Sequence, residues 1–406
     1  MSGECCLQFA SAVIAKKRAD KITTLAKLST PTTSAVSSPS LSVSLPSHFL
    51  QTKRTTSGGE RVPVWLMRQA GRYMADFRKY SDKIPFRERS ETPEIALELS
   101  LQPWRAFRPD GVIMFSDILT PLPALGVEFD VVKGRGPVIS SPLRSLEQVA
   151  ALRTLDDPAS SLPFVAPVLQ ALRSEVGNAS TVLGFVGTPW TLAAYAVEGK
   201  ADKHCMETKK MMRRDPELLH SILEKLSEAM AVYVVHQIDS GAQVVQLFDS
   251  WAHHLSPGQY AEFSMPYSEK VIAAVKRARP DAPLILHANG GTGKLDQLCK
   301  TGADVVGLDW STSMRAARAE AGDGATLAGN VDPMELFGGE AAIARAVERC
   351  LVESDNSGSA RGRHILNVGH GVAQGTPEEA VGIFCELARR SAATLAEKSK
   401  AAAVAA

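Results

Sequence analysis

Eight short apolar runs, separated by helical patterns, constrain the fold of this chain more than any other feature. Most of the runs are continuously apolar and end in Gly, Asn, Asp, Ser or His. Continuous apolar runs are typical of parallel strands that are covered on both faces. They occupy residues 63–67, 111–116, 181–186, 242–250, 283–289, 303–309, 326–330 and 364–369. Eight such strands alternating with helices predict an α/β fold, a single-domain (β/α)8 TIM barrel.

An open, doubly wound parallel sheet is the alternative architecture for this repeat. That fold usually carries a glycine-rich nucleotide turn after its first strand. Here the first run leads into Arg-Gln-Ala-Gly-Arg, residues 68–72, so the barrel is favoured. Four helices are expected to start at an N-cap residue that precedes a proline, namely Thr92, Thr188, Asp215 and Ser256. Thr376, with Glu379 three residues later, predicts a capping box.

The first 58 residues differ in composition from the rest of the chain. They are rich in Ser and Thr and contain seven Lys and Arg but only two acidic residues. A Ser-rich, basic, acid-poor start is typical of an organellar transit peptide, and an ordinary disordered tail is the alternative. We expect a disordered transit peptide at 1–58, a catalytic barrel at 59–398 and a flexible tail at 399–406.

Charge and cysteine usage narrow the classes of partner. Removing the seven basic and two acidic residues of the leader changes the formal net charge from +1 to −4. A mildly acidic chain argues against non-specific binding to nucleic acid or to a membrane surface. No apolar run is long enough to span a bilayer. The six cysteines form no Cys-x-x-Cys pair, and such usage suits a reducing compartment.

Three motifs suggest a cofactor or a metal but lack the residues that such a group needs. The stretch 290–294 is similar to a phosphate-binding loop, but Leu295 stands where Ser or Thr should follow the lysine. The adjacent residues His253 and His254 are poorly placed to share a metal. Lys294 has no visible partner residue for a pyridoxal cofactor. The sequence therefore predicts neither a cofactor nor a metal site.

Polar side chains follow the predicted strands at their carboxyl ends, where barrel enzymes carry their active sites. The first run is followed by Arg68 and Arg72, and the second by a lone acid, Asp117. Arginine presents a planar fork of donors that suits carboxylates and phosphates. Later strand ends, and the helix after the third strand, supply Tyr195, Asp249, Ser250, His287 and His370. Together these residues predict an anion-binding pocket that contains one buried acid.

Four blocks of the chain resemble the uroporphyrinogen decarboxylase family, and the resemblance covers about residues 60 to 395. The blocks are residues 63–73, 115–119, 184–192 with Tyr195, and 367–371. The leader, together with residues 133–138 and 307–310, is most similar to the plastid forms of plants and algae. The resemblance thus implies a chloroplast enzyme of the plastid stroma, active after removal of the transit peptide. It also implies a homodimer.

The resemblance implies a cofactor-independent carboxy-lyase that acts on a small molecule. It would remove the four acetate carboxyl groups of uroporphyrinogen III as CO2, giving coproporphyrinogen III in heme and chlorophyll biosynthesis. Asp117 and Arg68 are the implied catalytic residues, although the very high pKa of arginine favours binding over proton transfer for Arg68. The implied substrate-binding residues are Arg68, Gln69, Ala70, Gly71, Arg72, Phe86, Ser116, Asp117, Tyr195, Ser250 and His370.

Two features depart from the family pattern. Several relatives carry an arginine thirteen residues after the first signature arginine, and Ser81 stands at that position here. The nearby residues Arg78, Arg87 and Arg89 are the candidates for replacing the lost charge. The spacing between Arg72 and Phe86 is also one residue shorter than in many relatives, so Phe86 is assigned by a weaker match.

Two other functions are compatible with parts of this pattern. A sister class of zinc-dependent methyltransferases holds its metal through a His-x-Cys at the end of the fifth strand. Here that strand ends in His287, Ala288 and Asn289, so the thiolate is missing. A non-catalytic tetrapyrrole carrier is the second alternative, and the presence of Asp117 beside both arginines argues against it.

Overall fold

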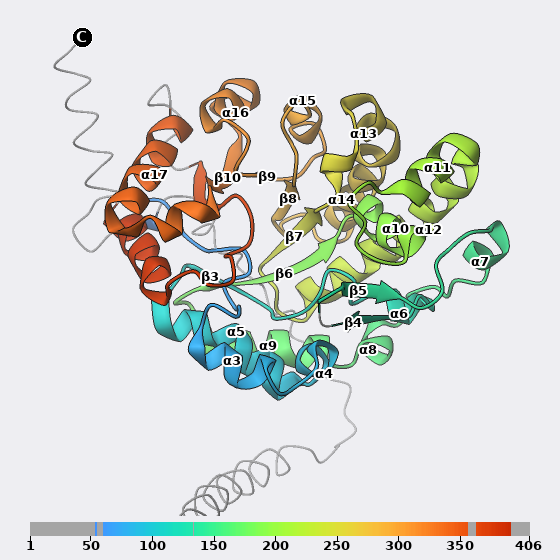
Figure 1. Ribbon diagram of the computed structural model, residues 1–406, viewed down its shortest axis with the longest axis horizontal. Helices are drawn as coiled ribbons and strands as arrows, with labels where there is room; N and C mark the ends of the chain where they lie inside the picture. Colours follow the sequence, from blue (N-terminus) through green and yellow to red (C-terminus); the bar gives the residue numbers. More distant parts are fainter. Residues whose placement is uncertain (1–52, 55–59, 133, 356–362, 391–406) are drawn as a thin grey trace, which may run out of the picture. The chain divides into compact units, whose positions relative to one another are not determined.

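A computed structural model describes residues 53–54, 60–132, 134–355 and 363–390 of the protein. Seven parallel strands form its main sheet (Figure 1). In spatial order they are β11 (His364–Val368), β10 (Thr326–Val331), β9 (Val305–Leu308), β8 (Leu284–Ala288), β7 (Val244–Asp249), β6 (Thr181–Gly187) and β3 (Gly111–Ile113). Each strand overlaps one of the runs predicted from the sequence, which confirms seven of the eight expected strands.

The remaining run, residues 63–67, lies between the edge strands β11 and β3. Val64 forms a parallel β-bridge with Leu366 of β11. On the side of β3, the Val64 carbonyl accepts a hydrogen bond from the Asp110 amide at 2.7 Å. The Val64 amide donates to the Asp110 carboxylate at 2.9 Å instead of to a neighbouring backbone carbonyl. The run therefore completes the predicted barrel without forming a regular strand.

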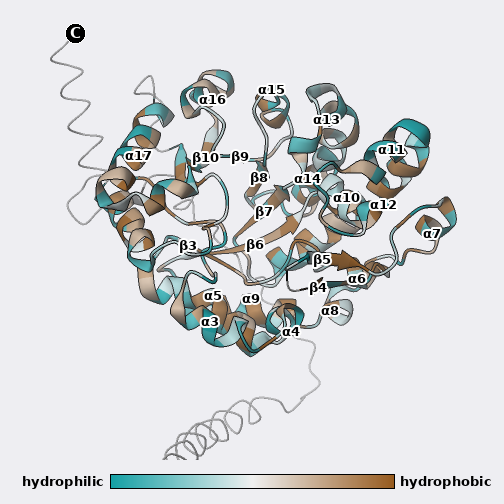
Figure 2. Ribbon diagram, in the orientation of Figure 1, coloured by the Kyte–Doolittle hydropathy of each residue, from teal (hydrophilic) through white to brown (hydrophobic). Residues whose placement is uncertain are grey.

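Side chains from all eight runs fill the barrel interior. They form one cluster that consists of Trp65, Met67, Ile113, Leu183, Val244, Phe248, Ile285, Val305, Ala328 and Ile365. Because the first run contributes Trp65 and Met67 to this cluster, packing as well as hydrogen bonding closes the ring. The strands are predominantly hydrophobic along their length (Figure 2), as expected for strands buried on both faces.

Helices surround the strands and cover their outer face (Figure 1). The larger ones are α5 (Pro93–Phe107), α9 (Val165–Val176), α10 (Pro189–Glu198), α12 (Pro216–Asp239), α14 (Met265–Ala278) and α17 (Gly339–Ser354). One face of α12 carries an apolar stripe in which Leu219, Ile222 and Leu226 are completely buried. This stripe recurs with the spacing of an amphipathic helix, so the periodicity of the sequence determines which face packs inward.

Shorter elements connect these layers. The helices are α3 (Ala75–Ser81), α4 (Phe86–Glu91), α6 (Leu122–Leu125), α7 (Leu146–Ala150), α8 (Pro158–Ser161), α11 (Met206–Arg214), α13 (Pro257–Phe263), α15 (Leu295–Leu298), α16 (Met314–Ala321), η1 (Ala252–His254) and η2 (Pro333–Phe337). A further helical stretch covers residues 378–390. Two antiparallel pairs complete the described elements: β1 (Lys53–Arg54) with β2 (Glu60–Arg61), and β4 (Phe129–Val132) with β5 (Gly136–Ile139).

Three of the five predicted helix caps form as expected. The side chains of Thr188, Asp215 and Ser256 each accept a hydrogen bond from a backbone amide in the first turn. Thr92 stands at the N-cap of α5, but its side chain accepts no such bond. The prediction of a capping box at Thr376 is wrong, because the Thr376 hydroxyl is buried without a hydrogen-bond partner.

Most of the predicted leader, apart from Lys53–Arg54 in β1, and the whole of the predicted 399–406 tail lie outside the described residues. None of the helices in the described part of the chain is both long and apolar enough to cross a bilayer. The β4–β5 hairpin was not expected from the sequence. It contributes Val131, Val132, Gly136 and Pro137 to the wall of the cavity described next.

Candidate active site

A cavity of about 1300 Å³ opens at the carboxyl ends of the barrel strands. It is larger than the ~300–1,000 Å³ typical of sites for drug-sized ligands. All but one of the residues predicted to bind substrate line it. They are Arg68, Ala70, Gly71, Arg72, Phe86, Ser116, Asp117, Tyr195, Ser250 and His370. The structure therefore brings together residues that lie up to three hundred positions apart in the sequence.

Gln69 is the exception, because its side chain points away from the cavity into the barrel wall. It is only 1% exposed. Its amide nitrogen donates to the Gly111 carbonyl at 3.1 Å, and its amide oxygen accepts from the Leu66 amide at 3.4 Å. Tyr73 donates its hydroxyl proton to the Gln69 carbonyl at 2.7 Å. Gln69 thus joins the first run to β3 and shapes the turn that carries the arginines.

Arg68 sits in that turn with a left-handed backbone, at φ 56°. This conformation is energetically unfavourable for a residue other than glycine, which suggests that the Arg68 side chain is needed at this place in the turn. Both Arg68 and Arg72 are exposed to the cavity rather than buried in the barrel wall. Gly371 follows β11 and leaves room for Arg68, since a Cβ on Gly371 would lie 2.3 Å from Arg68 Cδ.

Asp117 follows β3 and presents one carboxylate oxygen to the cavity. Oδ1 accepts a hydrogen bond from the Leu119 amide at 2.8 Å, whereas Oδ2 has no hydrogen-bond partner among the described residues. The Asp117 backbone is held by its amide donating to Thr120 Oγ1 at 3.2 Å. Burial raises the pKa of Asp117, and the Leu119 amide and the charge of Arg68 act against that rise.

The charge of Arg68 links the polar residues of the site. Besides its effect on Asp117, it lowers the pKa of His370, in addition to the lowering that burial causes. Burial raises the pKa of Tyr195, whose ring contacts Trp251 at a centroid distance of 4.5 Å. Burial also lowers the pKa of His287 to about 4, so this cavity residue is a neutral imidazole at neutral pH. The cavity therefore brings Arg68 and the Asp117 carboxylate together with two histidines whose pKa values are lowered.

The position of Ser250 depends on a completely buried neighbour, Asp249. Thr191 and Ser264 donate hydroxyl protons to the two carboxylate oxygens of Asp249 at 2.9 and 2.5 Å. Burial raises the pKa of Asp249, and these two hydrogen bonds oppose the rise. Asn289 Nδ2 donates to the Ser250 carbonyl at 3.2 Å. Asp249 thus fixes the end of β7 against the helices and holds Ser250 at the cavity.

The three arginines that could replace a charge at Ser81 lie in different surroundings. Arg78 donates to the backbone carbonyls of Arg72 and Tyr73 and does not line the cavity. Arg87 pairs with Glu91 at 2.7 Å, also outside the cavity. Arg89, by contrast, lines it together with Ser81.

Sequence reasoning missed most of the apolar wall of the cavity. Phe185 of β6 and Phe248 of β7 meet edge to face, with ring centroids 5.7 Å apart. Trp310 and Met334 also line the cavity, and their side chains are exposed. The strand positions of Phe185 and Phe248 were recognised, but a continuous apolar run does not reveal which of its residues points inward.

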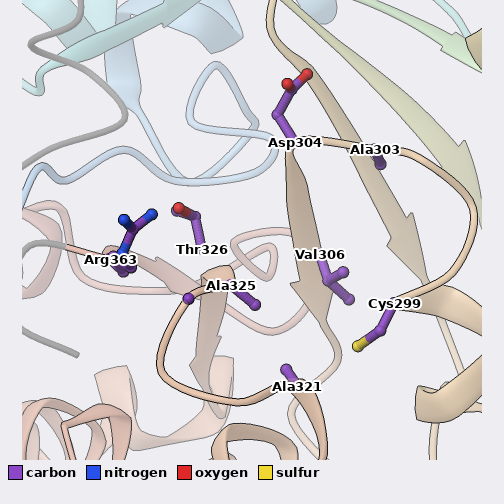
Figure 3. A pocket seen from close by; sticks show the side chains of 9 residues that line it. Cys299, Ala303, Asp304, Val306, Ala321, Ala325, Thr326 and Arg363 are labelled. Carbon is purple, nitrogen blue, oxygen red and sulfur yellow. The ribbon is translucent and has the colours of Figure 1, made fainter. Parts of the chain in front are cut away.

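A second cavity, of about 440 Å³, lies at the opposite ends of the strands (Figure 3). It is lined by residues that precede or begin β9, β10 and β11, among them Asp304, Thr326 and Arg363. Asp304 is engaged in an ion pair with Lys276 at 2.6 Å. Because barrel enzymes act at the carboxyl ends of their strands, the larger cavity is the candidate active site.

Comparison with known proteins identifies the family of this chain. The model of the uroporphyrinogen decarboxylase family matches residues 49–391. The chain belongs to this family. A uroporphyrinogen decarboxylase of Crocosphaera subtropica is 55% identical over 82% of this chain and 92% of its own length. One from a Synechocystis species is 54% identical over 82% and 93%.

Among solved structures, the chain is similar in fold to a methyltransferase from Methanosarcina mazei. The TM-score is 0.68 at 20% identity, over 82% of this chain and 94% of that one. A B12-independent methionine synthase from a Shewanella species gives a TM-score of 0.50 at 11% identity, over 74% and 88% of the two chains. These identities are low enough that the likeness concerns the barrel alone.

Proposed function

We propose that this protein decarboxylates uroporphyrinogen III, converting its four acetate side chains to methyl groups and releasing four molecules of CO2. The observation that carries the proposal is the free oxygen of Asp117, which faces a large cavity that Arg68 and Arg72 also line. A cavity of about 1300 Å³ with this charge pattern suits a large, polyanionic ring. Membership of the family and the names of the cyanobacterial relatives support the same reaction.

The substrate itself can supply the electron sink that decarboxylation needs. Protonating the pyrrole carbon next to the acetate-bearing carbon makes a cationic imine. The bond to the carboxylate carbon then breaks, and its electrons flow into this cation as CO2 leaves. A proton added to the resulting methylene carbon gives the methyl group, and loss of the ring proton restores the pyrrole. Each acetate thus consumes one proton and releases one CO2, and no external redox partner is needed.

Asp117 would stabilise the cation in this scheme. Its free carboxylate oxygen can accept hydrogen bonds from the pyrrole N–H groups and act as a preorganised counter-charge. Its partly desolvated position strengthens that interaction, because Coulombic attraction grows as the effective dielectric falls. The raised pKa of Asp117 reflects the same desolvation.

Arg68 and Arg72 would bind substrate carboxylates. Guanidinium groups remain protonated at neutral pH and are poor general acids in water, so we assign binding to Arg68 ahead of proton transfer. Tyr195, Ser250 and His370 would contact the ring or its side chains, since all three line the cavity.

Two further features belong to this proposal. We infer plastid targeting from the Ser-rich, basic leader, and the cyanobacterial origin of the relatives is consistent with a plastid enzyme. We also infer a homodimer. Uptake of the full chain by isolated chloroplasts, with shortening of the imported protein, would support targeting, and light scattering of purified protein would decide the oligomeric state.

Incubation of the purified protein with uroporphyrinogen III under anaerobic conditions tests the reaction. We expect CO2 release in step with the appearance of products that carry seven, six, five and four carboxyl groups. Binding without CO2 release would favour a tetrapyrrole carrier instead. Tightly bound zinc in metal analysis, together with activity lost on chelation, would favour the methyltransferase class.

A further inference from the structure

Arg89 is a buried arginine at the edge of the candidate active site. It belongs to α4 and lines the large cavity, although it is only 7% exposed. Its guanidinium carbon lies 5.5, 5.4 and 5.7 Å from the ring centroids of Phe77, Phe86 and Phe115. Three aromatic rings therefore surround the cation and hold it in position.

Most of the hydrogen-bond donors of Arg89 are unused. Nε donates to the Ile84 carbonyl at 2.9 Å, but Nη1 is buried without a hydrogen-bond partner. Within the part of the chain that the structure describes, Nη2 has no hydrogen bond, and no carboxylate lies within ion-pair distance of the guanidinium. A buried cation that lacks both a counter-charge and hydrogen-bond acceptors is unfavourable, unless a bound anion supplies them.

The surroundings of Arg89 indicate which anion would do so. Cation–π contacts engage the faces of the rings, but the N–H donors of a guanidinium lie in its plane and require oxygen acceptors. A carboxylate oxygen is such an acceptor, and its hydrogen bond to a guanidinium is strengthened by the opposite charges. The neighbouring charges that act on Arg89 are those of Arg72, which lowers its pKa, and Asp82, which raises it.

From this geometry we infer that Arg89 is a third carboxylate-binding arginine of the active site. The inference deepens the proposed function and rests on it for the identity of the substrate. Arg89 lines the same cavity as Asp117, Arg68 and Arg72, so a carboxylate of the bound ring can complete it. It positions the ring and favours substrates that carry many carboxylates.

A purely structural arginine would behave differently. Through its bond to Ile84, Arg89 also supports the segment between α3 and α4. If this support were its only role, replacing Arg89 would change stability but leave the affinity for a polycarboxylate intact. The experiment must therefore separate binding from folding.

Three variants of the full chain make this separation. Arg89→Gln removes the charge, and Arg89→Lys keeps it. Arg87→Gln is the matched control, because Arg87 lies on the same helix but pairs with Glu91 outside the cavity. For each, KM and kcat for uroporphyrinogen III are measured beside the thermal midpoint. Affinity for uroporphyrin, the unreactive oxidised ring with the same carboxylates, is measured by fluorescence quenching.

We expect Arg89→Gln to raise KM and weaken uroporphyrin binding by about tenfold or more, as for loss of a charge-assisted hydrogen bond. The kcat should change much less, Arg89→Lys should recover part of the affinity, and Arg87→Gln should match the wild type. Wild-type uroporphyrin affinity in a folded Arg89→Gln variant would overturn the inference. If Arg89→Gln does not fold, Arg89→Met takes its place, because methionine keeps an extended apolar side chain without the charge, and wild-type uroporphyrin affinity in that variant would overturn the inference equally. A wild-type protein that binds uroporphyrin but releases no CO2 would refute the proposed reaction without affecting this test.

Discussion

Gly371 and Arg68 lie against each other at the carboxyl end of the barrel. A Cβ on Gly371 would approach Arg68 Cδ to 2.3 Å, Cγ to 2.8 Å and Cβ to 3.1 Å. The contact therefore involves the stem of the arginine rather than only its tip. Since Arg68 also has a left-handed backbone, the turn and the glycine together determine where its guanidinium points.

We predict that Gly371→Ala disables the site while leaving the fold intact. The added methyl group displaces the Arg68 side chain, and a displacement of about 1 Å at a substrate-positioning group can cost about 10- to 100-fold in kcat/KM. Decarboxylation assays and thermal melting of the purified variant measure the two effects. Gly258→Ala is the control, since no atom lies within 4 Å of the added methyl group there. Unchanged kcat/KM in Gly371→Ala would show that Arg68 can reach the substrate from another position.

Alanine at Gly369, two residues earlier, should instead destabilise the fold. A Cβ on Gly369 would lie 2.1 Å from the Trp310 amide nitrogen and 2.5 Å from Trp310 Cα. These are backbone atoms that cannot rotate away, so β11 and the segment after β9 would have to separate. We predict that Gly369→Ala lowers the free energy of unfolding by about 3 kcal/mol or more. Urea denaturation measures this loss, and a midpoint equal to that of the wild type would contradict the prediction.

The sequence predicted the barrel and the ends of its strands because these features depend on local pattern. Seven of the eight apolar runs form parallel strands, and the residues that follow them lie at the same edge of the sheet. Asp117, Ser250 and His370 could therefore be assigned to one site before any contact between them was known. Arg68 and Arg72 followed from the same argument.

The features that the sequence did not predict depend on contacts between residues, most of which lie far apart in the chain. The first strand is reduced to a bridge because the carboxylate of Asp110 takes the amide of Val64. Gln69 points into the wall because the carbonyl of Gly111 offers it an acceptor. The Thr376 hydroxyl is buried and does not cap its helix. No local pattern encodes these pairings.

Asp117→Asn should abolish most of the turnover. The amide oxygen of asparagine can still accept the hydrogen bond from Leu119, but the side chain no longer carries the negative charge that opposes the cation. Removing a preorganised electrostatic group typically reduces kcat by a factor on the order of 10² to 10³. Asp130→Asn, the same change at an exposed position, is the control and should leave kcat unchanged. Near-wild-type turnover in Asp117→Asn would remove Asp117 from the mechanism.

The same substitution should stabilise the protein, in a way that depends on pH. Burial raises the pKa of Asp117 above its ordinary value of 3.8, so the folded chain holds this proton to a higher pH than the unfolded chain does. Stability therefore falls as pH rises from 3.8 through the raised pKa, and it stays lowered above it. Asparagine has no proton to lose. Urea midpoints should consequently be higher for Asp117→Asn than for the wild type at neutral pH, and the difference should shrink on acidification towards pH 3.8. A difference that grew on acidification would mean that Arg68 stabilises the Asp117 carboxylate by more than burial destabilises it.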